Sequence, residues 1–276
     1  MNVFDLTCGI VTYENDFEIL SHTISSVLNT ELNIQLVIFD NSGTDKIKKL
    51  CYDKRIVYHY HPKNIGFGAG HNYIWQHLRG NAPFHLVLNP DVYFDRDTLI
   101  YLSNYLRLYP EVGLAMPKIL NVDGSLQYNC KLLPTPWNLF VRRFLYSFQR
   151  IVARSDYYYE MRFADYNCEM DVPYLSGCFM FLNANAVEEV GLFDERFFLY
   201  GEDIDFSRRM HLAYKTRYYP KVQVYHHHAK GSYKSLRLFW HNLRSAILYF
   251  NKWGWWDKER VLVNREVFNM VKYKLC

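Results

Sequence analysis

The sequence lacks several features that would assign it to common protein classes. It contains no apolar run of about 18 residues and no basic segment followed by an apolar one near residue 1, so we expect neither a transmembrane helix nor a secretion signal. None of its six cysteines forms a C-x-x-C pair, which argues against a zinc finger and predicts reduced thiols in a cytoplasmic protein. Because the net charge is only +4 and Lys and Arg form no dominant run, we expect no nucleic-acid partner.

Apolar strands and helical patterns alternate over the first 120 residues. Strand-like runs lie at 6–13, 34–39, 55–60 and 84–88, and helical patterns lie at 19–28, after residue 70 and at 99–106. This alternation predicts an α/β fold with a mostly parallel sheet covered on both faces. At 276 residues, the chain fits one large domain with a small appendage.

The alternation stops between residues 134 and 171. Phe140, Phe144, Phe148 and Ile151 recur there at helical spacing among arginines, which predicts one basic amphipathic segment. After it we expect extended runs at 172–182 and 222–226, helices at 184–190 and after residue 202, and an amphipathic helix at 236–250 followed by tryptophans.

Polar side chains follow the apolar strands of the predicted sheet. Ligands of parallel sheets bind beyond the carboxyl ends of the strands, so these residues form the candidate site. Asp40 either stabilises a turn or accepts hydrogen bonds from a nucleobase or ribose. The glycine-rich segment 64–70 forms a turn whose backbone N–H groups could approach a nucleotide. His71 replaces the third glycine of a dinucleotide-binding fingerprint, which disfavours an oxidoreductase.

Two separate segments offer ligands for a divalent metal. Asp91 ends an Asn-Pro-Asp turn after the 84–88 strand, where a carboxylate can hold an ion on the phosphates of a sugar nucleotide. His226 and His228 end an extended run and point to the same side of it. Because imidazole is a good ligand for manganese-like ions, we favour one of them, His226 first, over a chance polar strand end.

Three carboxylates, Glu202, Asp203 and Asp205, fall within four positions after an aromatic run. Acidic residues in a first helical turn are ordinary partners of the helix dipole. Three of them beside aromatic residues also suggest a catalytic carboxylate, which could take the proton of an attacking hydroxyl.

Taken together, these motifs resemble glycosyltransferase family 2, and within it the bacterial rhamnosyltransferase-like branch. The resemblance covers about residues 5–230 in the expected order. It is carried by Val11-Thr12-Tyr13, Asp40-Asn41-Ser42, Asn64-Ile65-Gly66-Phe67-Gly68, Leu88-Asn89-Pro90-Asp91, Ser176-Gly177-Cys178, Gly191 to Phe198 and Glu202-Asp203-Ile204-Asp205.

This resemblance implies a GT-A fold and an inverting transfer of a sugar. It assigns Asp203 as the base, Glu202 as its tuning or acceptor-orienting neighbour, and Asp91 with His226 or His228 as ligands of Mn²⁺ or Mg²⁺. The donor is implied to be dTDP-rhamnose or a UDP-hexose. Asn89 stands where the family often has Asp, which makes metal dependence less certain. The expected donor-side residues are Thr12, Tyr13, Asp40, Asn64, Gly66, Phe67, Asn72 and Asn89, and the expected acceptor-side residues are Ser176, Gly177 and Trp240.

The predicted organisation is a GT-A domain at 1–232 and a helical tail at 233–276. The implied acceptor is a hydroxyl of a bacterial surface glycan, such as an O-antigen or capsule, linked to a polyprenyl diphosphate. The basic segment and the tryptophan-rich tail could rest on the inner face of the plasma membrane, or else cover the core or form a homodimer contact. Two rivals remain at this point: a non-catalytic sugar-nucleotide or glycan-binding scaffold, and a nucleotidyltransferase, for which the 6–13 region offers no lysine- and glycine-rich motif.

Overall fold

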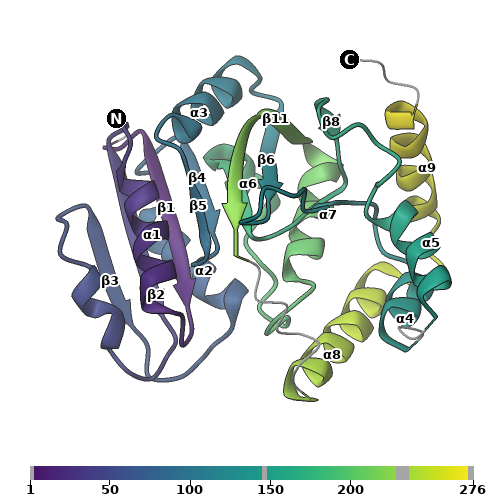
Figure 1. The fold of residues 1–276 in the computed structure, drawn as a ribbon, viewed down its shortest axis with the longest axis horizontal. Coiled ribbons are helices and arrows are strands. Elements are labelled where there is room, and N and C mark those ends of the chain that lie inside the picture. The colour runs from purple at the N-terminus through teal and green to yellow at the C-terminus, as the bar shows by residue number, and fades with distance from the viewer. Residues whose placement is uncertain (1–2, 145–147, 228–235, 273–276) are drawn as a thin grey trace.

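The computed structural model describes residues 3–144, 148–227 and 236–272. Its amino-terminal part follows the predicted alternation of strands and helices (Figure 1). The elements are β1 (Leu6–Thr12), α1 (Phe17–Leu28), β2 (Ile34–Asp40), the short 3₁₀ helix η1 (Lys46–Leu50), β3 (Ile56–Tyr60), α2 (Phe67–Leu78), β4 (Phe84–Leu88), β5 (Val92–Phe94), α3 (Thr98–Leu108) and β6 (Val112–Leu120).

The remaining part of the chain is less regular and ends in two long helices. Its elements are β7 (Cys130–Lys131), α4 (Pro136–Phe144), α5 (Gln149–Tyr159), β8 (Met170–Asp171), β9 (Tyr174–Leu175), β10 (Phe179–Asn183), α6 (Ala184–Val190), α7 (Glu202–Ala213), β11 (Lys215–His226), α8 (Leu236–Trp253) and α9 (Lys258–Lys272).

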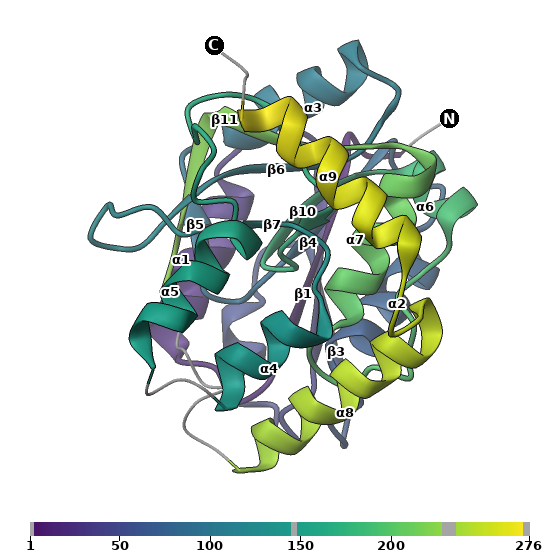
Figure 2. The same cartoon turned by 90° about the vertical axis from the view of Figure 1, so that its right-hand side faces the viewer.

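One mixed sheet forms the centre of the molecule, with the strand order β3-β2-β1-β4-β10-β6-β11-β5 and β8 paired with β11. The pairs β1–β2, β2–β3, β1–β4 and β6–β11 are parallel, whereas β10 runs against β4 and β6. Every residue of β1 is buried, because helices cover both faces. Figure 2 shows α1 on one side of the sheet and α2, α6 and α7 on the other. The expected mostly parallel sheet is confirmed.

The strand directions bring several chain segments to one edge of the sheet. Phe179 at the start of β10 pairs with Leu88 at the end of β4, and β11 runs in the same direction as β6. The ends of β1, β2, β4 and β11 therefore share an edge with the start of β10. In Figure 1 the arrowheads of β1 and β11 point toward this edge, on the side of the molecule where α8 lies.

The two carboxy-terminal helices pack on the rest of the chain through α7. Trp253 Nε1 donates a hydrogen bond to Asp205 Oδ1 at 2.8 Å, and Lys252 Nζ lies 2.7 Å from the same oxygen. Arg208 is 1 % exposed, stacks on the Trp253 ring at 3.9 Å and pairs with Asp257 at 2.6 Å. The predicted boundary at 232/233 lies outside the described residues and stays a prediction.

Several local expectations need correction. Helix α2 begins at Phe67 rather than after Gly70, so the glycines tolerated in its first turn hid its start. The single amphipathic segment is two helices, α4 and α5. Cys168 is disulfide-bonded, so the expectation of reduced thiols is wrong there, because C-x-x-C spacing reveals only pairs close in sequence. No described helix is long and apolar enough to cross a bilayer.

Candidate active site

The end of β2 carries Asp40, which is completely buried. Its Oδ1 accepts hydrogen bonds from Thr12 Oγ1 at 3.2 Å and from the Ser42 amide at 3.0 Å. Its Oδ2 accepts a hydrogen bond from Tyr58 Oη at 2.8 Å. The carboxylate thus links the end of β1, the turn after β2 and the side chain of Tyr58 on β3. This is the first of the two roles predicted for Asp40, the stabilisation of a turn. The predicted contact with a nucleobase would need one of its remaining lone pairs.

The glycine-rich segment is held against the 198 loop. Gly66 has φ 98°, and a Cβ on it would lie 2.4 Å from the Phe198 carbonyl oxygen, so only glycine fits there. Asn64 Oδ1 accepts a hydrogen bond from the Gly66 amide at 2.9 Å. The Phe67 amide donates to the same Phe198 oxygen at 3.3 Å, which leaves fewer free N–H groups for a nucleotide than the sequence suggested. Tyr13 is 46 % exposed beside this edge.

Asp91 and His226 lie side by side, as predicted from two motifs far apart in the chain. Pairing of β5 with β11 places His226 opposite Val92, and His226 Nε2 lies 3.2 Å from Asp91 Oδ1. Gln127 holds the other ring nitrogen, with Oε1 3.0 Å from His226 Nδ1, and also donates to the His226 carbonyl at 2.8 Å. Burial disfavours a charge on the imidazole, but Cys178 and Asp91 outweigh it and raise the pKa of His226 to about 10.

This donor set fits a divalent ion. When Nδ1 carries the proton and donates it to Gln127, Nε2 keeps its lone pair and faces the Asp91 carboxylate. A hydrogen bond from the other ring nitrogen is the usual support of a metal-binding histidine. An ion would replace the positive charge that the imidazolium now supplies to Asp91. Within the described ranges no group of three or more His, Cys, Asp or Glu side chains could hold a metal. The remaining ligands would have to be diphosphate oxygens and water. His228, the second candidate, lies outside the described residues.

Asp203 sits in the first turn of α7 and is held by three donors. Its Oδ2 accepts hydrogen bonds from Tyr174 Oη at 3.0 Å and from the Gly177 amide at 3.1 Å, and its Oδ1 accepts one from the Ile204 amide at 2.9 Å. A side chain at Gly177 would place its Cβ 3.0 Å from the Asp203 Cβ. The carboxylate is therefore fixed in position while remaining partly exposed.

The segment 176–178 connects this carboxylate with the Asp91–His226 pair. The Gly177 amide donates to Asp203. The next residue, Cys178, hydrogen-bonds to His226 through its side chain, and its carbonyl oxygen accepts from the Asn89 amide at 2.9 Å. The predicted metal ligands and the predicted base thus meet around one short stretch of chain. That arrangement allows a proton to be removed close to a bound metal and diphosphate.

Glu202 precedes the predicted base and is buried, with 5 % of its surface exposed. Its Oε2 has no hydrogen-bond partner among the described residues. Burial, together with the negative charge of Asp203, raises the pKa of Glu202 well above its usual range. Burial thus favours the protonated form of Glu202, next to the Asp203 carboxyl that three donors hold in place.

The structure gives other predicted site residues supporting roles. Asn72 is buried, and its side-chain amide donates to the Phe193 carbonyl and to Glu195 Oε1 at 2.9 Å and accepts from the Phe193 amide. It therefore positions the 193–195 segment, and its contact with a donor stays a prediction. Asp205 is occupied by Arg209, Lys252 and Trp253.

On the acceptor side, the Ser176 amide donates to the Asn129 carbonyl oxygen at 3.3 Å. Trp240 is 64 % exposed on α8, and its only ring contact among the described residues is with Phe239. Its acceptor role stays a prediction. Sequence reasoning missed Tyr174 and Gln127, since neither belongs to a motif and only the folded sheet brings them to Asp203 and His226.

Comparison with known proteins decides the family. The sequence model of the family described as "Glycosyl transferase family 2" matches residues 7–191, which is more than half of the chain. The chain belongs to glycosyltransferase family 2. It is therefore a glycosyltransferase, and the resemblance read from its motifs is confirmed.

Relatives within glycosyltransferase family 2 include two bacterial rhamnosyltransferases. The chain is 26% identical over 261 residues to the N-acetylglucosaminyl-diphospho-decaprenol L-rhamnosyltransferase of Mycobacterium tuberculosis, which covers 89% of this chain and 84% of that one. It is 25% identical over 240 residues to rhamnosyltransferase WbbL of Escherichia coli K12, covering 84% and 85%. A third relative is the low-salt glycan biosynthesis hexosyltransferase Agl10 of Haloferax volcanii, 27% identical over 211 residues, covering 74% and 61%.

The fold agrees with this family. A crystal structure of GalNAc-T7 with UDP, GalNAc and Mn²⁺ superposes on the chain with a TM-score of 0.60 at 14% sequence identity. The match covers 81% of this chain and 43% of that one, so this chain spans less than half of that protein. The likeness confirms the expected GT-A fold.

Proposed function

We propose that this glycosyltransferase moves one sugar from a nucleoside-diphosphate donor to a hydroxyl group of a lipid-linked bacterial surface glycan, with inversion at the anomeric carbon. The observation that carries the proposal is the meeting of Asp203 and the Asp91–His226 pair around residues 176–178. A base and a metal site at one sheet edge are what a single displacement requires.

In the proposed reaction, the acceptor oxygen attacks the anomeric carbon while Asp203 takes the hydroxyl proton. The bond between that carbon and the diphosphate oxygen breaks on the opposite side, and the electron pair leaves with the diphosphate. Asp91 and His226 would hold Mn²⁺ or Mg²⁺, which would stabilise the charge on the leaving diphosphate. Tyr174 and the Gly177 amide hold the Asp203 carboxylate in position, and the raised pKa of Glu202 disfavours a second negative charge beside it.

The printed names of the relatives support the choice of substrates. Two relatives are rhamnosyltransferases and one is a hexosyltransferase, so we propose dTDP-rhamnose or a UDP-hexose as the donor. One relative is named for an acceptor on decaprenyl diphosphate, which supports a polyprenyl-diphosphate-linked acceptor here. The proposal includes a cytoplasmic protein that works at the inner face of the plasma membrane, with residues 1–232 as the transferase domain and 233–276 as a tail packed on it.

Isothermal titration with UDP and with dTDP, each with and without Mn²⁺, tests these roles. We expect Mn²⁺ to strengthen binding of one nucleotide, which identifies the donor. Asp91→Ala should abolish that strengthening, because it removes a metal ligand. Asp203→Asn should keep nucleotide binding but lower turnover by about 10²–10⁴-fold, the usual contribution of a general base.

Asp95→Ala is the matched control, since Asp95 is an exposed carboxylate four positions after Asp91. It should behave as the wild type in both measurements. If neither nucleotide binds under any condition, the proposal is wrong. If Asp203→Asn retains full turnover, the transferase activity stands but another residue is the base.

A further inference from the structure

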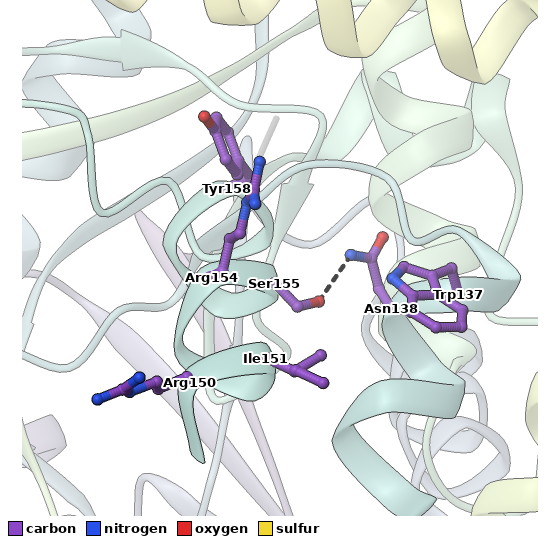
Figure 3. A pocket seen from close by; sticks show the side chains of 7 residues that line it. All are labelled: Trp137, Asn138, Arg150, Ile151, Arg154, Ser155 and Tyr158. Atoms are coloured by element: carbon purple, nitrogen blue, oxygen red, sulfur yellow. Dashed lines mark hydrogen bonds between the residues drawn. The ribbon is translucent and has the colours of Figure 1, made fainter. Parts of the chain in front are cut away.

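A groove lies between α4 and α5, outside the site described above, with a volume of about 580 Å³. Figure 3 shows Ile151 and Ser155 pointing from α5 toward Asn138 and Trp137 of α4. Ser155 Oγ accepts a hydrogen bond from Asn138 Nδ2 at 3.1 Å. This bond joins the two helices, and the groove is large enough for a ligand of several hundred cubic ångströms.

The groove is positively charged. Arg150 and Arg154 line it, and neither forms an ion pair within the part of the chain that the structure describes. Figure 3 shows Arg154 extending beside Tyr158 and Arg150 extending outward from the start of α5. The guanidinium groups of Arg150 and Arg154 therefore favour a phosphate-bearing ligand.

Apolar side chains that are open to solvent also line the groove. Trp137 is 58 % exposed and Ile151 is 43 % exposed. Exposing large apolar side chains around a cationic groove is unfavourable in water alone. The combination matches an amphiphile with a phosphate head and a hydrocarbon chain, whereas a free phosphate would leave the apolar walls without a partner.

Both helices of the groove are anchored beside the predicted base. Tyr159 of α5 packs with Tyr174, the residue that hydrogen-bonds Asp203, and Ile204 packs against the same cluster. Leu139 of α4 packs in a neighbouring cluster that also includes Ile204. Both helices that form the groove therefore belong to side-chain clusters that include Ile204, the residue next to Asp203.

We infer that the groove between α4 and α5 binds the diphosphate and the first hydrocarbon units of the lipid that carries the acceptor sugar. This inference rests on the proposed function, which it extends by assigning the lipid end of the acceptor to named residues. The arginines pair with the diphosphate, and Trp137 and Ile151 cover the start of the hydrocarbon chain. The sugar attached to the diphosphate then reaches toward Asp203.

The test is isothermal titration of the full chain with farnesyl diphosphate, farnesol and inorganic diphosphate, in buffer with EDTA so that no metal holds diphosphate at Asp91. We expect farnesyl diphosphate to bind at least about tenfold more tightly than either fragment. Arg150→Gln/Arg154→Gln should weaken that binding by about tenfold or more. Ile151→Glu, which places a like charge in the groove, should weaken it similarly.

The matched control is Arg79→Gln/Lys54→Gln, which removes two exposed cations from the amino-terminal half and should leave farnesyl diphosphate binding unchanged. Equal binding of farnesyl diphosphate and inorganic diphosphate, or unchanged binding in both groove variants, overturns the inference. Titration with UDP and dTDP in Mn²⁺ separates the two proposals. A protein that binds nucleotide but not farnesyl diphosphate refutes the groove alone, and the reverse pattern supports the groove and refutes the donor site.

Discussion

Glu202→Gln should stabilise the protein by an amount that grows with pH. In the unfolded chain Glu202 titrates near its ordinary pKa of 4.5, whereas burial and Asp203 keep it protonated in the folded protein. Above pH 4.5 folding must therefore take up a proton. The stability that this group contributes is fully present below pH 4.5 and is lost as pH rises toward its folded pKa. Glutamine has the shape of the protonated acid and takes up no proton.

The magnitude follows from linkage. Each pH unit above 4.5 costs the wild type about 1.4 kcal/mol while Glu202 stays protonated in the folded state. The stability of Glu202→Gln relative to the wild type should therefore rise at this rate above pH 5, until the pH approaches the folded pKa of Glu202. Contributions from other titrating groups cancel in this difference, because both proteins contain them.

Urea unfolding at pH 5, 6.5 and 8 measures the effect. Glu188→Gln is the control, since Glu188 is an exposed carboxylate on α6, and its difference from the wild type should not change with pH. A flat difference for Glu202→Gln would mean that Glu202 is ionised in the folded protein and would refute the reasoning.

Turnover of the same variant separates two roles for Glu202. If it acts as a neutral neighbour of Asp203, Glu202→Gln should keep its kcat within a few-fold of the wild type at pH 7. A general base would lose about 10²–10⁴-fold. A loss of that size would move the base from Asp203 to Glu202.

Three further outcomes follow from the geometry. His85 is neutral in the folded state, because burial lowers its pKa to about 3. The free energy of unfolding should therefore fall by about 2 kcal/mol from pH 7 to pH 5. His85→Gln should remove that part of the decline, as measured by urea unfolding. Gly177→Ala would press on the Asp203 Cβ and should lower kcat by about 10²-fold while nucleotide titration stays unchanged. Asp205→Ala removes the buried carboxylate shared by Arg209, Lys252 and Trp253 and should lower the stability measured in thermal unfolding by about 1–3 kcal/mol, whereas the exposed Asp95→Ala should cost little.

The sheet could be predicted from the sequence because its strands are short apolar runs separated by helical patterns. The α4–α5 region could not, since residues 134–171 combine helical spacing with arginines, and the pattern does not show where one helix ends. The start of α2 was also misplaced. Glycine favours turns in general, but Gly68 and Gly70 lie inside the helix because Phe193 and Val11 pack closely against them.

The candidate site, like the fold, could be predicted only in part from the sequence. Asp91 and His226 could be paired from the sequence because each ends a strand, and strand ends meet at an edge. Tyr174 and Gln127 could not, since their roles depend on partners 29 and 99 positions away in the chain. The raised pKa of Glu202 also required the folded structure, because it arises from burial and from the neighbouring Asp203.

The attachment of the last two helices to α7 bears on how relatives of this chain could be recombined. Asp205 and Arg208 follow the predicted base within two turns of one helix, yet their partners, Trp253 and Asp257, lie in the last part of the chain. A chimaera that exchanges residues 233–276 alone would remove the Asp257 partner of Arg208 and leave Asp205 with Arg209 alone. The carboxy-terminal helices and the inward-facing charges of α7 therefore have to be exchanged as one unit.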